Sequence, residues 1–71
     1  MESSARLKLA KKIRVLRKEK GMTQDELANL TGIDYKYIQK IEGKTPPAVR
    51  IDTLERLAKA FQLTCSQLLE F

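Results

Sequence analysis

Thr23–Glu42 reads TQDELANLTGIDYKYIQKIE, and it holds the start of one helix, a glycine turn and a second helix. Its first four residues have the pattern of a capping box. In this pattern the Thr23 hydroxyl accepts from the backbone N–H of Glu26, and the Glu26 carboxylate accepts from the N–H of Thr23. A helix is therefore predicted to begin at the next residue. Gly32 stands where helices commonly end in a left-handed residue, and Asp34 is a residue type that caps a new helix. The stretch predicts two short helices joined by a tight turn.

The second helix has two chemically different sides when its residues are placed at 100° intervals. Ile38 and Ile41 define an apolar side. The opposite side carries groups that read base edges in the major groove of DNA: Gln pairs with adenine, Lys reaches guanine, and Tyr contacts a thymine methyl group or a phosphate. A solvated polar side, which most surface helices have, is the alternative interpretation. The preceding capped helix and glycine turn favour DNA recognition. The candidate base-reading residues are Tyr35, Lys36, Gln39 and Lys40.

Apolar residues at helical spacing predict three further helices outside this unit. The first covers about residues 4–20, the second begins near Ile51, and a capping box at Thr64 opens a short last helix. The chain is therefore predicted to be an all-α domain over residues 1–71. The predicted core residues are, in chain order, Leu9, Ile13, Leu16, Leu27, Ala28, Leu30, Thr31, Ile38, Ile41, Ile51, Leu54, Leu57, Ala58 and Phe61.

The charge distribution favours a polyanionic partner. The chain has 71 residues and a net charge of +5. Residues 1–44 hold 11 Lys and Arg against 6 Asp and Glu, whereas residues 45–71 hold three of each. All the excess positive charge therefore lies with the first three predicted helices, where DNA binding would need it. A basic amphipathic helix also suits a membrane surface, but the first helix lacks the Trp or Phe anchors of such helices.

The composition argues against catalysis and against an extracellular protein. The chain has no histidine and one cysteine, so it cannot form a Ser-His-Asp triad, a histidine metal site or a structural zinc site. No glycine-rich phosphate loop is present. No enzyme activity, cofactor, metal or small-molecule ligand is expected. The chain also lacks a disulfide framework, a signal peptide and an apolar run of about 20 residues, which predicts a cytoplasmic protein with no membrane segment.

Residues 9–69 resemble the phage-repressor helix-turn-helix family (Cro/repressor-type, lambda-repressor-like). The resemblance rests on separate blocks that recur in order. It implies a compact five-helix domain, with the helix-turn-helix at about residues 23–42, that binds operator DNA, usually as a dimer. The matching blocks are Ile13-Arg14, Leu16-Arg17, Lys20 to Gln24, Leu27-Ala28, Gly32-Ile33, Ile38, Ile41-Glu42, Leu54, Leu57 to Phe61, and Leu68-Leu69.

The resemblance also implies roles for individual residues. The four candidate base-reading residues would lie in the major groove, and Gln24 would touch a phosphate at the start of its helix. Arg17 and Glu42 would form a partly buried ion pair that ties the first helix to the base-reading helix. The alternative is two exposed, unrelated charges, worth at most about 1 kcal/mol if they meet.

The segment GKTPPAVR after Glu42 is predicted to be a loop because of its Gly and Pro content. It is slightly longer than the family pattern. Its polar residues can contact phosphates beside the base-reading helix, or they can belong to a plain linker. The candidate phosphate-contacting residues in this loop are Lys44, Thr45 and Arg50. Three further candidates lie outside the loop: Thr23, Gln24 and Tyr37.

The C-terminal residues Leu68, Leu69 and Phe71 are predicted to form a dimer contact because they add apolar surface where few neighbours remain to cover it. The alternative is that the two leucines close the core and Phe71 frays. A two-fold dimer through this region would set two base-reading helices about 34 Å apart on a pseudo-palindromic site.

The sequence therefore predicts a DNA-binding transcriptional regulator of the prokaryotic or phage type. Its length suits a stand-alone phage repressor or restriction–modification controller protein, or equally the DNA-binding part of a longer repressor. A protein-binding module, such as an antitoxin on the same scaffold, is the alternative from a different class.

Overall fold

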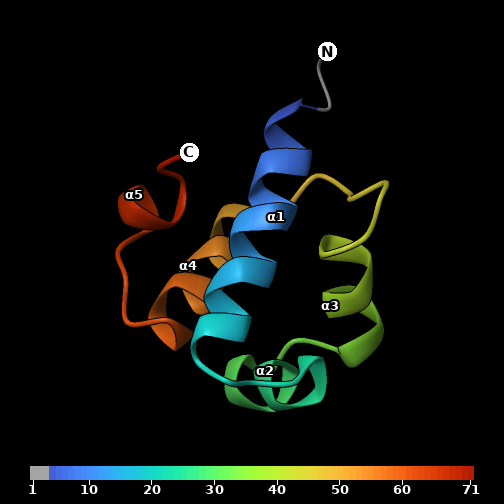
Figure 1. Ribbon diagram of the computed structural model, residues 1–71, viewed down its shortest axis with the longest axis vertical. Helices are drawn as coiled ribbons and strands as arrows, with labels where there is room; N and C mark the ends of the chain where they lie inside the picture. The colour runs from blue at the N-terminus through green and yellow to red at the C-terminus, as the bar shows by residue number, and fades with distance from the viewer. Residues whose placement is uncertain (1–3) are drawn as a thin grey trace.

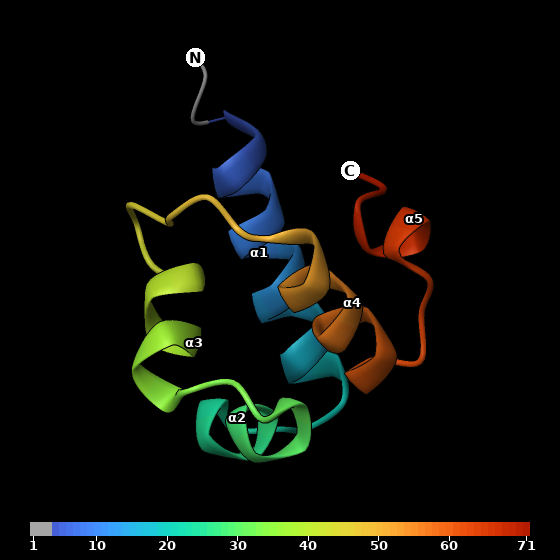
Figure 2. The same cartoon turned by 180° about the vertical axis from the view of Figure 1, so that it is seen from behind.

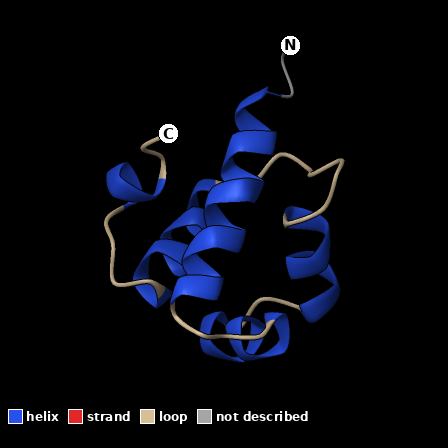
Figure 3. Cartoon of the chain, viewed as in Figure 1, coloured by secondary structure: helices blue, strands red, loops and turns tan. Residues whose placement is uncertain are grey.

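A computed structural model describes residues 4–71, and all its regular structure is helical over that range (Figure 3). The predicted all-α, five-helix fold is confirmed, and the first helix ends one residue before the predicted boundary. None of the described helices combines the length and the apolar composition needed to cross a membrane. The helices are α1 (Ser4–Glu19), α2 (Gln24–Thr31), α3 (Tyr35–Ile41), α4 (Ile51–Ala60) and α5 (Cys65–Leu68).

Local hydrogen bonds set the bounds of α2 and α3. The Thr23 hydroxyl accepts from the backbone N–H of Glu26 at 3.0 Å, and the Glu26 carboxylate accepts from the N–H of Thr23 at 2.8 Å. Gly32 ends α2 in the left-handed region, with φ of 74°, where a residue with a Cβ atom would cost about 1–2 kcal/mol. The Asp34 carboxylate then accepts from the backbone N–H of Lys36 at 3.0 Å and opens α3. These contacts fix the turn between the two helices.

The helix α1 lies between α3 on one side and α4 with α5 on the other (Figures 1 and 2). The helix α2 lies across the end at which α1 finishes. In this arrangement one side of α3 packs inward and its other side faces away from α4 and α5.

All five helices contribute to one hydrophobic core. The side chains that are almost completely buried come from all five helices and from Phe61, the residue that follows α4. They are Ile13, Leu27, Ile38, Ile41, Leu57, Phe61 and Leu68.

Two residues of the predicted core are exposed instead. Leu30 is 60% exposed and Ile51 is 73% exposed. At 100° per residue, Leu30 points about 110° away from the direction midway between Leu27 and Ala28, which are the buried residues of α2. Ile51 is the first residue of α4, and it lies about 70° from the centre of the stripe that the later apolar residues of that helix form.

Candidate nucleic-acid interface

The four candidate base-reading residues lie together on the exposed side of α3, which we call the outer face: Tyr35, Lys36, Gln39 and Lys40. The opposite side of α3 carries Ile38 and Ile41, which are buried. The outer face is therefore held toward solvent by a fixed hydrophobic contact on the other side of the same helix. It presents two ammonium groups, one amide and one phenol. All four groups can donate hydrogen bonds to base edges, and the oxygens of the amide and the phenol can also accept them.

The phosphate candidates at the start of α2 differ in exposure. Thr23 is exposed, and in the capping box its backbone N–H donates while its hydroxyl oxygen accepts. The O–H bond of Thr23 therefore remains as a donor for a phosphate. Gln24 is half-buried, and its amide Nε2 donates to Oε1 of Glu42 at 3.1 Å. An amide NH₂ carries two N–H bonds, so one remains for a phosphate. Tyr37 is half-buried and packs against the core, unlike the outer-face residues.

The loop after α3 divides the remaining phosphate candidates into two groups. Lys44 and Thr45 are exposed and follow α3 closely. Pro46 is buried, which anchors the loop to the rest of the molecule. Arg50 stands at the other end of the loop, at the start of α4, where its guanidinium donates to the Asp52 carboxylate at 3.1 Å. The loop therefore brings only Lys44 and Thr45 next to the C-terminal end of α3 along the chain.

Glu42 ends α3 and is buried, with only 4% of its surface exposed. Arg17 of α1 donates to both of its carboxylate oxygens, from Nε to Oε2 at 2.8 Å and from Nη2 to Oε1 at 3.0 Å. The third guanidinium nitrogen of Arg17 donates to the carbonyl of Met22 at 2.8 Å. This bidentate, shielded geometry rules out two unrelated exposed charges and ties α1 directly to the end of α3.

A second arginine of α1 also contacts the end of α3, and sequence reasoning missed it. Arg14 Nη1 donates to the backbone carbonyl of Glu42. The carbonyls at the end of a helix lack partners within the helix, and a cationic side chain can satisfy them. The signal was present in the spacing: Arg14 lies three residues before Arg17, so both reach the same side of α1.

The C-terminal residues do not all remain available for a dimer contact. Leu68 is 0% exposed, because it is part of the chain's own core, so it cannot contact a second copy. Its place in the predicted dimer contact is therefore wrong. Leu69 and Phe71 are exposed. Lys12 Nζ donates to the carbonyl of Glu70 at 2.7 Å, which ties this end of the chain to α1.

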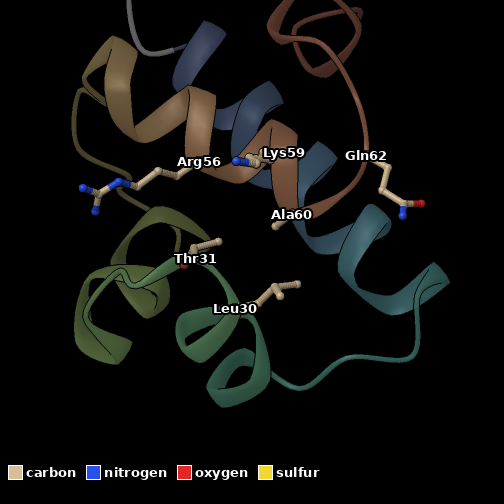
Figure 4. A pocket seen from close by; sticks show the side chains of 6 residues that line it. All are labelled: Leu30, Thr31, Arg56, Lys59, Ala60 and Gln62. Atoms are coloured by element: carbon tan, nitrogen blue, oxygen red, sulfur yellow. The ribbon is translucent and has the colours of Figure 1, made fainter.

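A groove between α2 and α4 lies outside this interface, since none of its lining residues belongs to α3 (Figure 4). The lining residues of the groove are Leu30, Thr31, Arg56, Lys59, Ala60 and Gln62.

Within residues 4–71, no group of three or more His, Cys, Asp or Glu side chains is placed to hold a metal ion.

Comparison with known proteins gives the same assignment at three levels. The family model for the Cro/C1-type helix-turn-helix DNA-binding domain matches residues 12–71. The transcriptional regulator DdrOP3 of Deinococcus deserti is 34% identical over 65 residues, which are 90% of this chain and 49% of that protein. The chain thus spans about half the length of this relative. The crystal structure of a hypothetical transcription factor, NHTF, from Neisseria superposes with a TM-score of 0.86 and 32% identity, over 97% of this chain and 76% of that one. The chain belongs to the Cro/C1-type helix-turn-helix DNA-binding family.

Proposed function

We propose that this protein is a sequence-specific regulator of transcription that acts in the cytoplasm, with α3 lying in the major groove of an operator. The observation that carries the proposal is the two-sided construction of α3. Its inner side is buried, and its outer face gathers all four side chains that can read base edges. Side chains of this kind discriminate bases because each base pair presents a distinct pattern of donors and acceptors in the major groove.

Phosphate contacts would set the orientation of α3 without selecting a sequence. Thr23 and Gln24 lie at the start of α2, where the positive end of the helix dipole favours an anion. Lys44 and Thr45 follow the other end of α3, and Tyr37 and Arg50 complete the proposed set. Contacts before and after α3 would hold both ends of the helix against the DNA backbone.

Fluorescence anisotropy with short labelled duplexes, including the DNA upstream of the protein's own gene, tests this function. Tight binding to one duplex that resists random competitor is expected. When the salt concentration rises tenfold, the logarithm of the binding constant should fall by about 0.9 for each phosphate that the protein neutralises. Gln39→Ala should weaken binding to that duplex by about 1–3 kcal/mol and relax the preference at one base pair. Lys44→Ala should weaken all duplexes alike.

If Gln39→Ala and Lys44→Ala both weakened random duplexes equally, the assignment of Gln39 to base reading would be wrong. Weak and uniform binding of the unaltered protein to every duplex would contradict sequence-specific recognition. It would favour a protein partner for the same scaffold.

We propose further that two copies of the chain contact each other through the C-terminal apolar surface, which Leu69 and Phe71 form. The resulting dimer would bind a pseudo-palindromic operator. Phe71 is 53% exposed, and Leu69 is exposed beside it. Phe71→Ser should shift the protein toward the monomer in sedimentation velocity and weaken operator binding. Leu30→Ser is the matched control, because Leu30 is similarly exposed but lies on α2. A monomer both free and on the operator would contradict the dimer.

A further inference from the structure

Tyr35 and Gln39 are in direct contact on the outer face of α3. The amide Nε2 of Gln39 donates to the hydroxyl oxygen of Tyr35 at 3.2 Å. Residues four apart are neighbours on a helix surface, so the contact needs no distortion of α3. From this contact we infer that Tyr35 is a positioning residue that orients the Gln39 amide to read adenine. The inference rests on the proposed function, in which Gln39 reads a base.

Gln39 has little choice of acceptor on this face. The ammonium groups of Lys36 and Lys40 are donors only. Among the four outer-face residues, therefore, only Tyr35 has a side-chain oxygen that can accept from the Gln39 amide. Tyr35 is the first residue of α3, next to the Asp34 cap, so its backbone is held in place by the hydrogen bonds that open the helix.

The bond leaves free the part of the amide that base recognition requires. An amide NH₂ group carries two N–H bonds, and Tyr35 takes one of them. The other N–H and the carbonyl oxygen remain as an adjacent donor and acceptor. Adenine presents the complementary pair in the major groove, an acceptor at N7 and a donor at N6, whereas guanine presents acceptors at both N7 and O6. A Gln39 amide held this way meets adenine with two hydrogen bonds and sets its carbonyl oxygen against the O6 of guanine.

Holding the side chain before DNA arrives should also strengthen binding. An exposed glutamine samples many rotamers, and ordering it on binding costs conformational entropy. Tyr35 has only two side-chain torsions and already restricts Gln39 in the free protein. The hydroxyl of Tyr35 should therefore contribute to affinity and base preference without itself touching the base that Gln39 reads.

A double-mutant cycle tests the coupling, with Tyr35→Phe, Gln39→Ala and the double variant. Tyr35→Phe removes the hydroxyl and keeps the ring. The probes are the tightest duplex from the anisotropy screen, its three variants at the base pair whose preference Gln39→Ala relaxes, and a random duplex. Tyr35→Phe should weaken binding to the tightest duplex roughly 3- to 10-fold and reduce the adenine preference at that base pair. In the Gln39→Ala background it should have no effect, and affinity for the random duplex should not change.

Three results would overturn the inference while leaving base reading by Gln39 intact. An equal effect of Tyr35→Phe in both backgrounds would show that the Tyr35 hydroxyl contacts DNA independently of Gln39. An equal loss on the random duplex would show that its hydroxyl meets a phosphate. Unchanged binding would show that the hydroxyl has no role. If Gln39→Ala itself left the preference at every base pair unchanged, base reading by Gln39 and the inference would fail together. Thermal unfolding of each variant checks that the fold is preserved.

Discussion

Arg17→Ala is expected to lower the free energy of unfolding by about 3–5 kcal/mol, because it leaves the carboxylate of Glu42 buried and without its cation. Both carboxylate oxygens accept from Arg17, and the Glu42 side chain is only 2% exposed. Gln24 would still donate one hydrogen bond, but it carries no charge. Domains of this size have roughly 4–10 kcal/mol of stability in total. Urea unfolding followed by circular dichroism measures the loss.

An exposed ion pair in the same chain provides the control. Arg50 donates to Asp52 at 3.1 Å, with the two side chains 81% and 60% exposed. Arg50→Ala should cost no more than about 1 kcal/mol. The double variant Arg17→Met, Glu42→Leu should recover most of the loss caused by Arg17→Ala, since no charge remains buried. Equal losses for Arg17→Ala and Arg50→Ala would show that burial does not matter to the pair.

The features that sequence reasoning predicted well are local ones. A capping box needs only residues three apart, so the hydrogen bonds at Thr23 and Thr64 follow directly from the sequence. The left-handed turn at Gly32 follows from the absence of a Cβ atom. These signals set the bounds of α2, α3 and α5, and with them the exposure of the outer face.

The features that sequence reasoning missed depend on how helices pack against one another. Leu30 has the apolar side chain of a core residue, but the positions of α3 and α4 against α2 decide which side of α2 is covered. Leu68 is likewise buried because α5 folds back onto the core, whereas the sequence placed it at an exposed end. The contact of Arg14 with the end of α3 joins residues 28 apart, so the three-residue spacing from Arg17 indicates the side of α1 on which Arg14 lies but not the carbonyl that it contacts.

The adjacent residues Ile38 and Gln39 should separate the stability of α3 from its recognition of DNA. Ile38 is fully buried, and Ile38→Ala is expected to lower the free energy of unfolding by about 2–5 kcal/mol, through lost apolar burial and the cavity that remains. Gln39→Ala lies on the outer face and should change stability by no more than about 0.5 kcal/mol. Chemical unfolding and anisotropy on the same two variants give both quantities.

The expected outcome is a crossed pattern. Ile38→Ala should lose stability and keep its base preference at low temperature, where enough folded protein remains, while Gln39→Ala should keep its stability and lose the preference at one base pair. If Ile38→Ala leaves too little folded protein, Ile38→Val offers a milder change, expected to cost about 0.5–1.5 kcal/mol. Similar stability losses for Ile38→Ala and Gln39→Ala would mean that α3 packs through both sides. The outer face would then not be free to enter a major groove, because a side chain that the fold itself needs cannot also present its edge to a base.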